Sequence, residues 1–166
     1  MKPTDKELGV LAHSLGEALL SRGVRVACAE SCTGGWISKV LTDIPGSSVW
    51  FGWGFVTYSN KAKKEALGVS EMILSEHGAV SEPVVIAMAQ GVQQMTAAEF
   101  FVAVSGIAGP DGGTDEKPVG TVWFAYGSAR RIQTDCRHFD GDRESVRRQS
   151  VAHALMSLSK IIRQTN

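Results

Sequence analysis

The spacing of hydrophobic residues predicts a helix at each end of the chain. In residues 5–22, leucine and alanine recur every three or four positions, which is the period of a helix that buries one face. Thr4 and Glu7 form a capping box ahead of this stripe, and Gly23 stands where a helix commonly ends. A second apolar stripe follows Asp142, which is expected to cap the final helix.

Between these two helices, segments rich in β-branched and aromatic residues alternate with further helical segments. Strands are expected at 24–28, 49–58 and 100–104, followed by a hairpin with arms at 119–126 and 131–139. Helices are expected at 34–43 and after the capping residues Asn60, Ser70 and Ser81. This alternation predicts an α/β fold, specifically a three-layer α/β/α single domain over residues 1–166 with a mixed, mostly parallel sheet.

Charge and composition narrow the classes of partner. The chain has 17 basic and 17 acidic residues, and a net charge of zero argues against a broad nucleic-acid-binding surface. No apolar run reaches the roughly 18 residues of a membrane span, and residues 1–7 contain no signal-peptide core. Cys28, Cys32 and Cys136 form no even disulfide framework, so free thiols in a reducing compartment are expected. We therefore expect a cytoplasmic protein with neither nucleic acid nor membrane as partner.

Two glycine-rich stretches, residues 29–35 and 105–113, each follow a predicted strand. Both contain too many glycines and hydroxyl side chains to continue that strand. A strand that ends in small residues presents free backbone N–H groups, which commonly hold an anionic group. Either stretch alone could be an ordinary turn. Two of them in one small domain favour a binding site in which they face each other.

The residue types available for catalysis are hydroxyls and lysines. The four histidines are scattered, with no metal-ligand spacing and no obvious place in a Ser-His-Asp triad, so neither a metal nor another cofactor is expected. A lysine kept neutral by burial or by a neighbouring cation can act as general base to a serine. The same residues could instead be capping hydroxyls and a solvated lysine-rich helix. The hydroxyls at predicted strand ends and turns are those of Ser31, Ser47, Ser48, Tyr58 and Ser105, and the lysines that follow are Lys61, Lys63 and Lys64.

Several short motifs together resemble the CinA C-terminal domain family. They are AESCTGG at 29–35, TYSN at 57–60 with Lys63 after it, GAVS at 78–81, SGIAGPDGG at 105–113, KPVGTV at 117–122, and GDR at 141–143 with Arg147. They span nearly the whole chain in order, and the chain is similar to stand-alone members of the family. The resemblance implies hydrolysis of the carboxamide of nicotinamide mononucleotide (NMN) to nicotinate mononucleotide and ammonia, in pyridine nucleotide recycling.

The resemblance also implies roles for individual catalytic residues. The family's serine–lysine chemistry makes Lys63 the general base, with Lys61 as the alternative. Ser48 is the first choice of nucleophile and Ser31 the second, although Ser31 could instead orient the amide or bind phosphate. Tyr58 is expected to assist proton transfer.

Substrate binding is expected at the two glycine-rich stretches and at the final helix. Arg143 and Arg147 lie in the first turns of that helix, where cations oppose the helix dipole. The resemblance implies that one of them meets the 5′-phosphate of NMN. The other residues expected to bind substrate are Thr33, Gly34, Ser105, Gly106, Gly109, Gly112 and Gly113.

Two further classes of function remain open from the sequence. One is a non-catalytic nucleotide-binding module linked to competence or DNA-damage responses, and release of ammonia from NMN would separate it from an amidase. The other is an interaction protein whose glycine-rich loops bind a partner. Trp50 and Trp53 lie in a segment that indicates core packing or a subunit contact, so a homodimer or higher homo-oligomer is expected.

Overall fold

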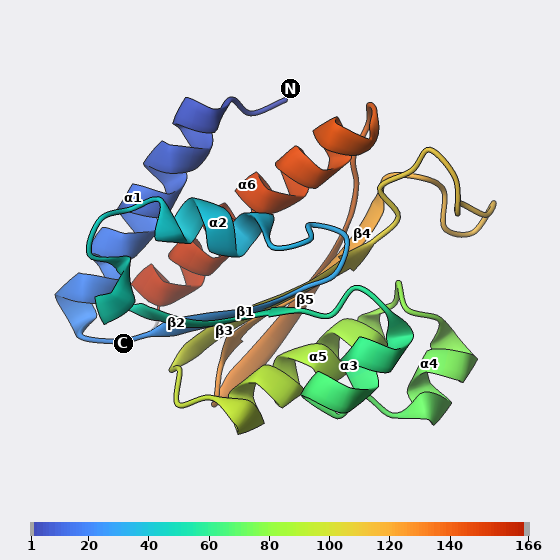
Figure 1. Cartoon of the computed structure of the whole chain (residues 1–166), viewed down its shortest axis with the longest axis horizontal. Coiled ribbons are helices and arrows are strands. Elements are labelled where there is room, and N and C mark those ends of the chain that lie inside the picture. The colour runs from blue at the N-terminus through green and yellow to red at the C-terminus, as the bar shows by residue number, and fades with distance from the viewer. Residues whose placement is uncertain (1, 165–166) are drawn as a thin grey trace.

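A five-stranded sheet forms the middle layer of the protein (Figure 1). The structure is a computed structural model that describes residues 2–164. From one edge to the other, the strand order is β2-β1-β3-β4-β5. The strands are β1 (Val26–Glu30), β2 (Phe51–Val56), β3 (Phe100–Gly106), β4 (Thr121–Ser128) and β5 (Arg131–His138).

The strand directions make the sheet mixed. β1 runs parallel to both β2 and β3, whereas β4 is antiparallel to β3 and to β5. Four of the five strands therefore point the same way, and β4 alone among them is reversed. The predicted α/β fold with a mixed, mostly parallel sheet is confirmed.

Helices cover both faces of the sheet, which gives the three predicted layers (Figure 1). Each helical layer has its own apolar core: one contains Trp50 and Phe124, and the other contains Met88 and Phe101. Helices α1 (Asp5–Arg22), α2 (Trp36–Thr42) and α6 (Arg143–Gln164) lie on one face, and α3 (Asn60–Leu67), α4 (Glu71–His77) and α5 (Glu82–Met95) lie on the other.

The two long helices at the ends of the chain match their sequence signals. α1 spans the predicted residues, Thr4 and Glu7 form the capping box, and Gly23 ends the helix in the left-handed conformation with φ 63°. Asp142 caps α6 by accepting the Ser145 N–H at 2.8 Å. These signals are local in sequence, so they determine the boundaries without help from the rest of the fold.

Two caps differ from the predictions. Ser59, and not Asn60, caps α3, because the Ser59 side chain is the one that accepts a first-turn N–H. Ser81 precedes α5 but makes no capping bond, since its hydroxyl donates to the Gly78 carbonyl at 2.8 Å.

Strand boundaries shift by a few residues. β1 begins at Val26, two residues later than predicted, and continues to Glu30 because residues 26–30 pair with strands on both sides. β2 is shorter than predicted, and a 3-10 turn (Ser47–Val49) precedes it. The sequence did not indicate that β1 extends to Glu30, since a carboxylate in a fully buried strand is exceptional.

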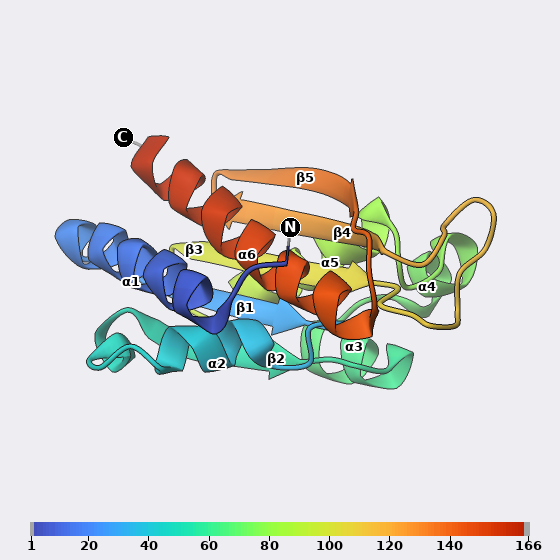
Figure 2. The ribbon, with the colours of Figure 1, turned by 90° about the horizontal axis from the view of Figure 1, so that it is seen from above.

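The strands β1, β2 and β3 end at the same edge of the sheet. The turn at 31–35, the segment 57–59 and the loop 107–120 follow these three ends, and Figure 2 shows that loop and the first turn of α6 beyond the same edge. The Ser31 N–H donates to the Val104 carbonyl at 3.0 Å, so the two glycine-rich stretches lie side by side as predicted. The carboxyl edge of a parallel sheet is where open α/β folds bind ligands.

Gly91 offers a test of the packing that positions α3. A Cβ at Gly91 of α5 would lie 2.2 Å from the Leu67 carbonyl oxygen, whereas a Cβ at Gly9 of α1 would meet no atom within 4 Å. We expect Gly91→Ala to lower the free energy of unfolding by about 1–3 kcal/mol, because overpacking forces α3 and α5 apart. Gly9→Ala should be neutral or stabilising by up to about 1 kcal/mol, since alanine is the better helix former. Urea unfolding measures both, and equal stability of the two variants would contradict the close contact.

Candidate active site

Lys63 lies buried at the base of a pocket at the carboxyl edge of the sheet. The residue projects from α3 and is only 1% exposed. Its Nζ donates to Ser31 Oγ at 2.9 Å and to the Thr57 carbonyl oxygen at 2.8 Å. Both acceptors are neutral, and burial lowers the pKa of Lys63 to about 8. A neutral amine in contact with a serine hydroxyl is therefore accessible near physiological pH.

Cys32, the residue after Ser31, carries no charge that would reverse this effect. Burial raises the pKa of its thiol to about 12. A protonated thiol gives the Lys63 ammonium no ionic partner. The low pKa of Lys63 thus follows from desolvation, which outweighs the opposing effect of Cys32.

The other two lysines of α3 face solvent. Lys61 lies 3.8 Å from Glu65, and its side chain is 78% exposed. Lys64 forms an ion pair with Glu71. The helical period therefore separates Lys63 from its neighbours, and the structure brings Lys63, not Lys61, to the hydroxyl groups of the pocket.

The turn that carries Ser31 is held by the carboxylate of Glu30. This fully buried side chain accepts the N–H groups of Gly35, Ile37 and Ser38 at 3.0, 3.0 and 2.8 Å, and the Ser38 hydroxyl at 2.7 Å. It therefore caps the N-terminus of α2 from inside the protein. The sequence indicated that this helix end could hold a ligand anion. The structure corrects that interpretation, because the chain's own anion occupies the position.

Arg147 braces the same turn. Its Nε donates to the Cys32 carbonyl at 3.0 Å, its Nη2 donates to the Thr33 carbonyl at 2.8 Å, and its guanidinium lies 5.2 Å from the centre of the Trp36 ring. The Nη2 atom also closes over Gly34, at 3.4 Å from where a Cβ would stand. Arg147, Thr33 and Gly34 thus form the support beneath the pocket, and none of them is among its lining residues.

Arg143 and Tyr58 meet at the pocket mouth. Arg143 Nη2 donates to the Tyr58 hydroxyl at 2.7 Å, and Nη1 donates to the Gly109 carbonyl at 2.8 Å. This guanidinium joins the segments that follow β2 and β3 to the start of α6. The pocket has a volume of about 220 Å³ and is lined by Ser31, Cys32, Tyr58, Asn60, Lys63, Ala79, Val80, Ser105, Gly106, Ala108 and Arg143.

The second glycine-rich stretch contributes less of the wall than predicted. Ser105 is buried, and its hydroxyl donates to the Ala79 carbonyl at 2.8 Å. Gly106 lines the pocket beside it, whereas Gly109, Gly112 and Gly113 do not. Gly109 and Gly112 have φ values of 80° and 93°, which side chains rarely adopt, so these glycines shape the loop.

Ser48 lies far from Lys63 within the chain. It belongs to the exposed 3-10 turn before β2, whereas Lys63 lies beyond the other end of that strand. Six residues of strand span roughly 20 Å at about 3.3 Å per residue. A Ser48–Lys63 pair within one chain is therefore wrong, and Ser31 is the serine that the fold brings to the amine.

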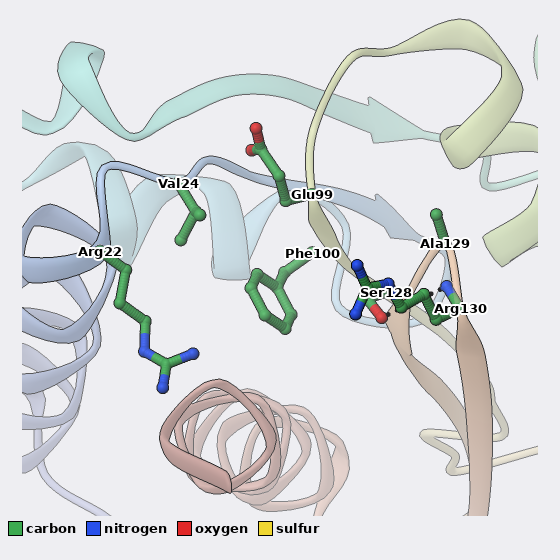
Figure 3. A pocket seen from close by; sticks show the side chains of 7 residues that line it. All are labelled: Arg22, Val24, Glu99, Phe100, Ser128, Ala129 and Arg130. Carbon is green, nitrogen blue, oxygen red and sulfur yellow. Dashed lines mark hydrogen bonds between the residues drawn. The ribbon is translucent and has the colours of Figure 1, made fainter. Parts of the chain in front are cut away.

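A larger hollow opens at the opposite edge of the sheet, but it lacks this chemistry. Figure 3 shows the Phe100 ring between Arg22 on one side and Arg130 on the other. The Glu99 carboxylate at this hollow accepts the Arg25 N–H at 2.7 Å, and no lysine lines it. Within residues 2–164, no cluster of His, Cys, Asp or Glu is placed to hold a metal ion, and no helix is long and apolar enough to cross a membrane.

Sequence reasoning missed Glu30 and the wall formed by Ala79 and Val80. An acid directly ahead of a glycine-rich turn that opens a helix is a signal for an internal cap, and it was available. Ala79 and Val80 reach the pocket through the placement of α4 and α5 beside β3, which no local signal encodes.

Comparisons with known proteins agree with this architecture. Residues 9–162 match the CinA C-terminal domain family. The chain is 58% identical over 156 residues to nicotinamide-nucleotide amidohydrolase PncC of Shigella flexneri, covering 93% of this chain and 94% of that protein. The protein of the same name from Pseudomonas putida is 54% identical over 151 residues, which cover 91% of this chain and 94% of the relative.

Solved structures of the same family share the fold. The competence damage-inducible protein A of Klebsiella pneumoniae superposes with a TM-score of 0.93 at 38% identity, covering 96% of this chain and 99% of that one. The competence/damage inducible protein CihA of Agrobacterium tumefaciens gives a TM-score of 0.91 at 40% identity, covering 97% and 98%. Sequence motifs, fold and overall similarity agree, and the chain belongs to the CinA C-terminal domain family.

Proposed function

We propose that this protein is a nicotinamide-nucleotide amidohydrolase that converts NMN to nicotinate mononucleotide and ammonia. The observation that carries the proposal is the 2.9 Å contact between the buried Lys63 Nζ and Ser31 Oγ. The choice of substrate is supported by relatives whose names state this activity and which are 54–58% identical over more than nine-tenths of the chain. The product would serve pyridine nucleotide recycling.

In the proposed mechanism Ser31 is the nucleophile and Lys63 the general base. Neutral Lys63 takes the Ser31 proton as Oγ attacks the carboxamide carbon, and it then gives that proton to the departing ammonia. Water, activated by the same amine, hydrolyses the resulting ester and releases the nicotinate product. Cys32 directly follows Ser31 in the chain and lines the pocket. We propose that its backbone N–H donates to the oxyanion that develops on the carboxamide oxygen.

The two arginines have separate roles in this proposal. Arg143 lines the pocket mouth and binds the 5′-phosphate. Its hydrogen bonds to the Tyr58 hydroxyl and the Gly109 carbonyl fix the position of the guanidinium. Arg147 is committed to the carbonyls of Cys32 and Thr33 and keeps the Ser31 turn in place. Tyr58 orients Arg143, and its predicted part in proton transfer stays a prediction.

Replacing Lys63 tests the base directly. We expect Lys63→Ala and Ser31→Ala each to lower kcat by at least about 10²-fold, the usual contribution of a general base or nucleophile. Lys61→Ala is the matched control on the same helix and should keep wild-type activity, because its side chain is exposed. Ammonia release from NMN is the measurement. A Lys63→Ala variant with more than about a tenth of wild-type kcat would falsify the assignment, and nucleotide binding without any wild-type turnover would favour the non-catalytic module.

The pH dependence follows from the lowered pKa of Lys63. The base must be neutral, so kcat/KM should rise about tenfold per pH unit below the pKa and level off above about 8. A lysine with its ordinary pKa would keep the profile rising to about 10. Rates in overlapping buffers from pH 6 to 10 distinguish the two cases, and activity that falls with rising pH across this range contradicts a lysine base.

A comparison of two substrates tests phosphate recognition. Nicotinamide riboside lacks the 5′-phosphate of NMN, and a charge-assisted hydrogen bond is worth roughly 1.5–3 kcal/mol. Arg143→Ala should therefore lower kcat/KM for NMN by about tenfold or more and leave the riboside, already a poor substrate, nearly unchanged. Arg147→Ala should lower both, because it loosens the turn under Ser31. Equal losses on both substrates in Arg143→Ala would remove this residue from phosphate binding.

A further inference from the structure

The Lys63 amine has one hydrogen-bond donor that the protein does not use. A lysine ammonium carries three N–H donors. Within residues 2–164, Nζ has two acceptors, the Ser31 Oγ at 2.9 Å and the Thr57 carbonyl oxygen at 2.8 Å. Lys63 also lines the pocket, although only 1% of the residue is exposed. The third donor is therefore available to a ligand that enters the pocket.

The pocket offers this ammonium no carboxylate. None of the residues that line it is Asp or Glu. Glu30, in the strand below, already accepts four hydrogen bonds from α2 and its first turn. The acids of the loop 107–120 are exposed and lie outside the lining. A buried charge without a partner is unfavourable, so the protonated form of Lys63 is stabilised by any anion that a ligand brings to it.

The other ionisable groups around Lys63 leave the pocket with cations alone. The turn after β1 contributes the Cys32 thiol, whose pKa burial raises to about 12. The segment after β2 contributes the Tyr58 hydroxyl, which accepts a hydrogen bond from Arg143 of α6. Glu82, the one acid of α5, is exposed, and so are the acids of α4. The pocket thus has a cationic group at its base, a second at its mouth, and no carboxylate between them.

We propose that protonated Lys63 binds the carboxylate of a nucleotide, the reaction's own product among them, in preference to the carboxamide of the substrate, so that the product inhibits the enzyme. This inference rests on the function proposed above. A ligand with a phosphate at one end and a carboxylate at the other matches the two cations of the pocket. Nicotinate mononucleotide carries both anions, whereas NMN carries the phosphate and a neutral amide.

Substrate and product therefore favour opposite protonation states of Lys63. The pyridinium ring of NMN is a cation, and like charges in one small pocket repel, so bound NMN favours the neutral amine that acts as base. Hydrolysis of the ester leaves a carboxylic acid beside that amine. Transfer of the acid proton to Nζ gives a carboxylate that faces an ammonium, a charge-assisted contact that the substrate does not make. The same lysine thus binds the product once the reaction is complete.

The protons exchanged on binding test this inference without turnover. Ser31→Ala cannot form the ester, so calorimetry in buffers of different ionisation enthalpy can count the protons exchanged as this variant binds each nucleotide. Near pH 8, the lowered pKa of Lys63, about half of the amines carry a proton. The product should then take up about half a proton, and NMN should release up to about the same amount. The 5′-phosphate is common to both ligands and already ionised at this pH.

Two double variants are the matched controls. Ser31→Ala combined with Lys63→Met should exchange no protons with either nucleotide, because the titrating amine is gone. Ser31→Ala combined with Lys61→Met should behave as Ser31→Ala does, since the Lys61 side chain is 78% exposed and lies outside the pocket lining.

Product inhibition of the wild type gives a second readout. The inhibition constant of nicotinate mononucleotide against NMN hydrolysis should be lowest below pH 8 and rise by up to about tenfold per pH unit above it, because the neutral amine no longer attracts the carboxylate. Failure of the product to bind, proton exchange of the same sign for both nucleotides, exchange that survives Lys63→Met, or an inhibition constant that is flat from pH 7 to 10 overturns the inference. A wild type that releases no ammonia from NMN rejects the proposed function, while the proton count with the product still decides whether Lys63 binds a carboxylate.

Discussion

The buried carboxylate of Glu30 is the interaction on which the site depends. Burying a carboxylate away from solvent and from any cation would cost several kcal/mol of folding free energy. Here four hydrogen bonds from α2 and its first turn offset that cost. These donors lie within eight residues of Glu30, so the chain must turn sharply after β1, at Gly34 and Gly35, which have φ values of 60° and 91°. The turn presents Ser31 at the end of a rigid central strand. A flexible loop could not hold the Ser31 hydroxyl as closely against the buried amine of Lys63.

The same arrangement keeps the acid and the base apart. The Glu30 carboxylate accepts hydrogen bonds from backbone N–H groups and the Ser38 hydroxyl, and it makes no ion pair with Lys63. Desolvation therefore dominates at Lys63 and lowers its pKa. A carboxylate bonded to the amine would raise that pKa. Burial thus lowers the pKa of Lys63, whose amine has only neutral hydrogen-bond acceptors.

Arg147 and Arg143 show how one helix end serves two purposes. They stand four residues apart at the start of α6, where cations are unfavourable for the helix, and each finds carbonyl acceptors in a different loop. Arg147 stabilises the turn after β1 from beneath, and Arg143 ties the loop after β3 to Tyr58. The first turn of α6 therefore fixes the relative positions of the segments that follow three parallel strands.

The sequence by itself determined the features whose causes are local. The ends of α1, the Asp142 cap and the left-handed Gly23 depend on residues a few positions apart, and all were predicted correctly. Only the tertiary structure decided which serine meets the lysine and which lysine is buried. Ser31 and Ser48 both stand beside a predicted strand end, yet β2 separates Ser48 from Lys63 by its whole length, while β1 delivers Ser31 to it. These choices depend on strand order and direction, which arise from packing between segments distant in sequence.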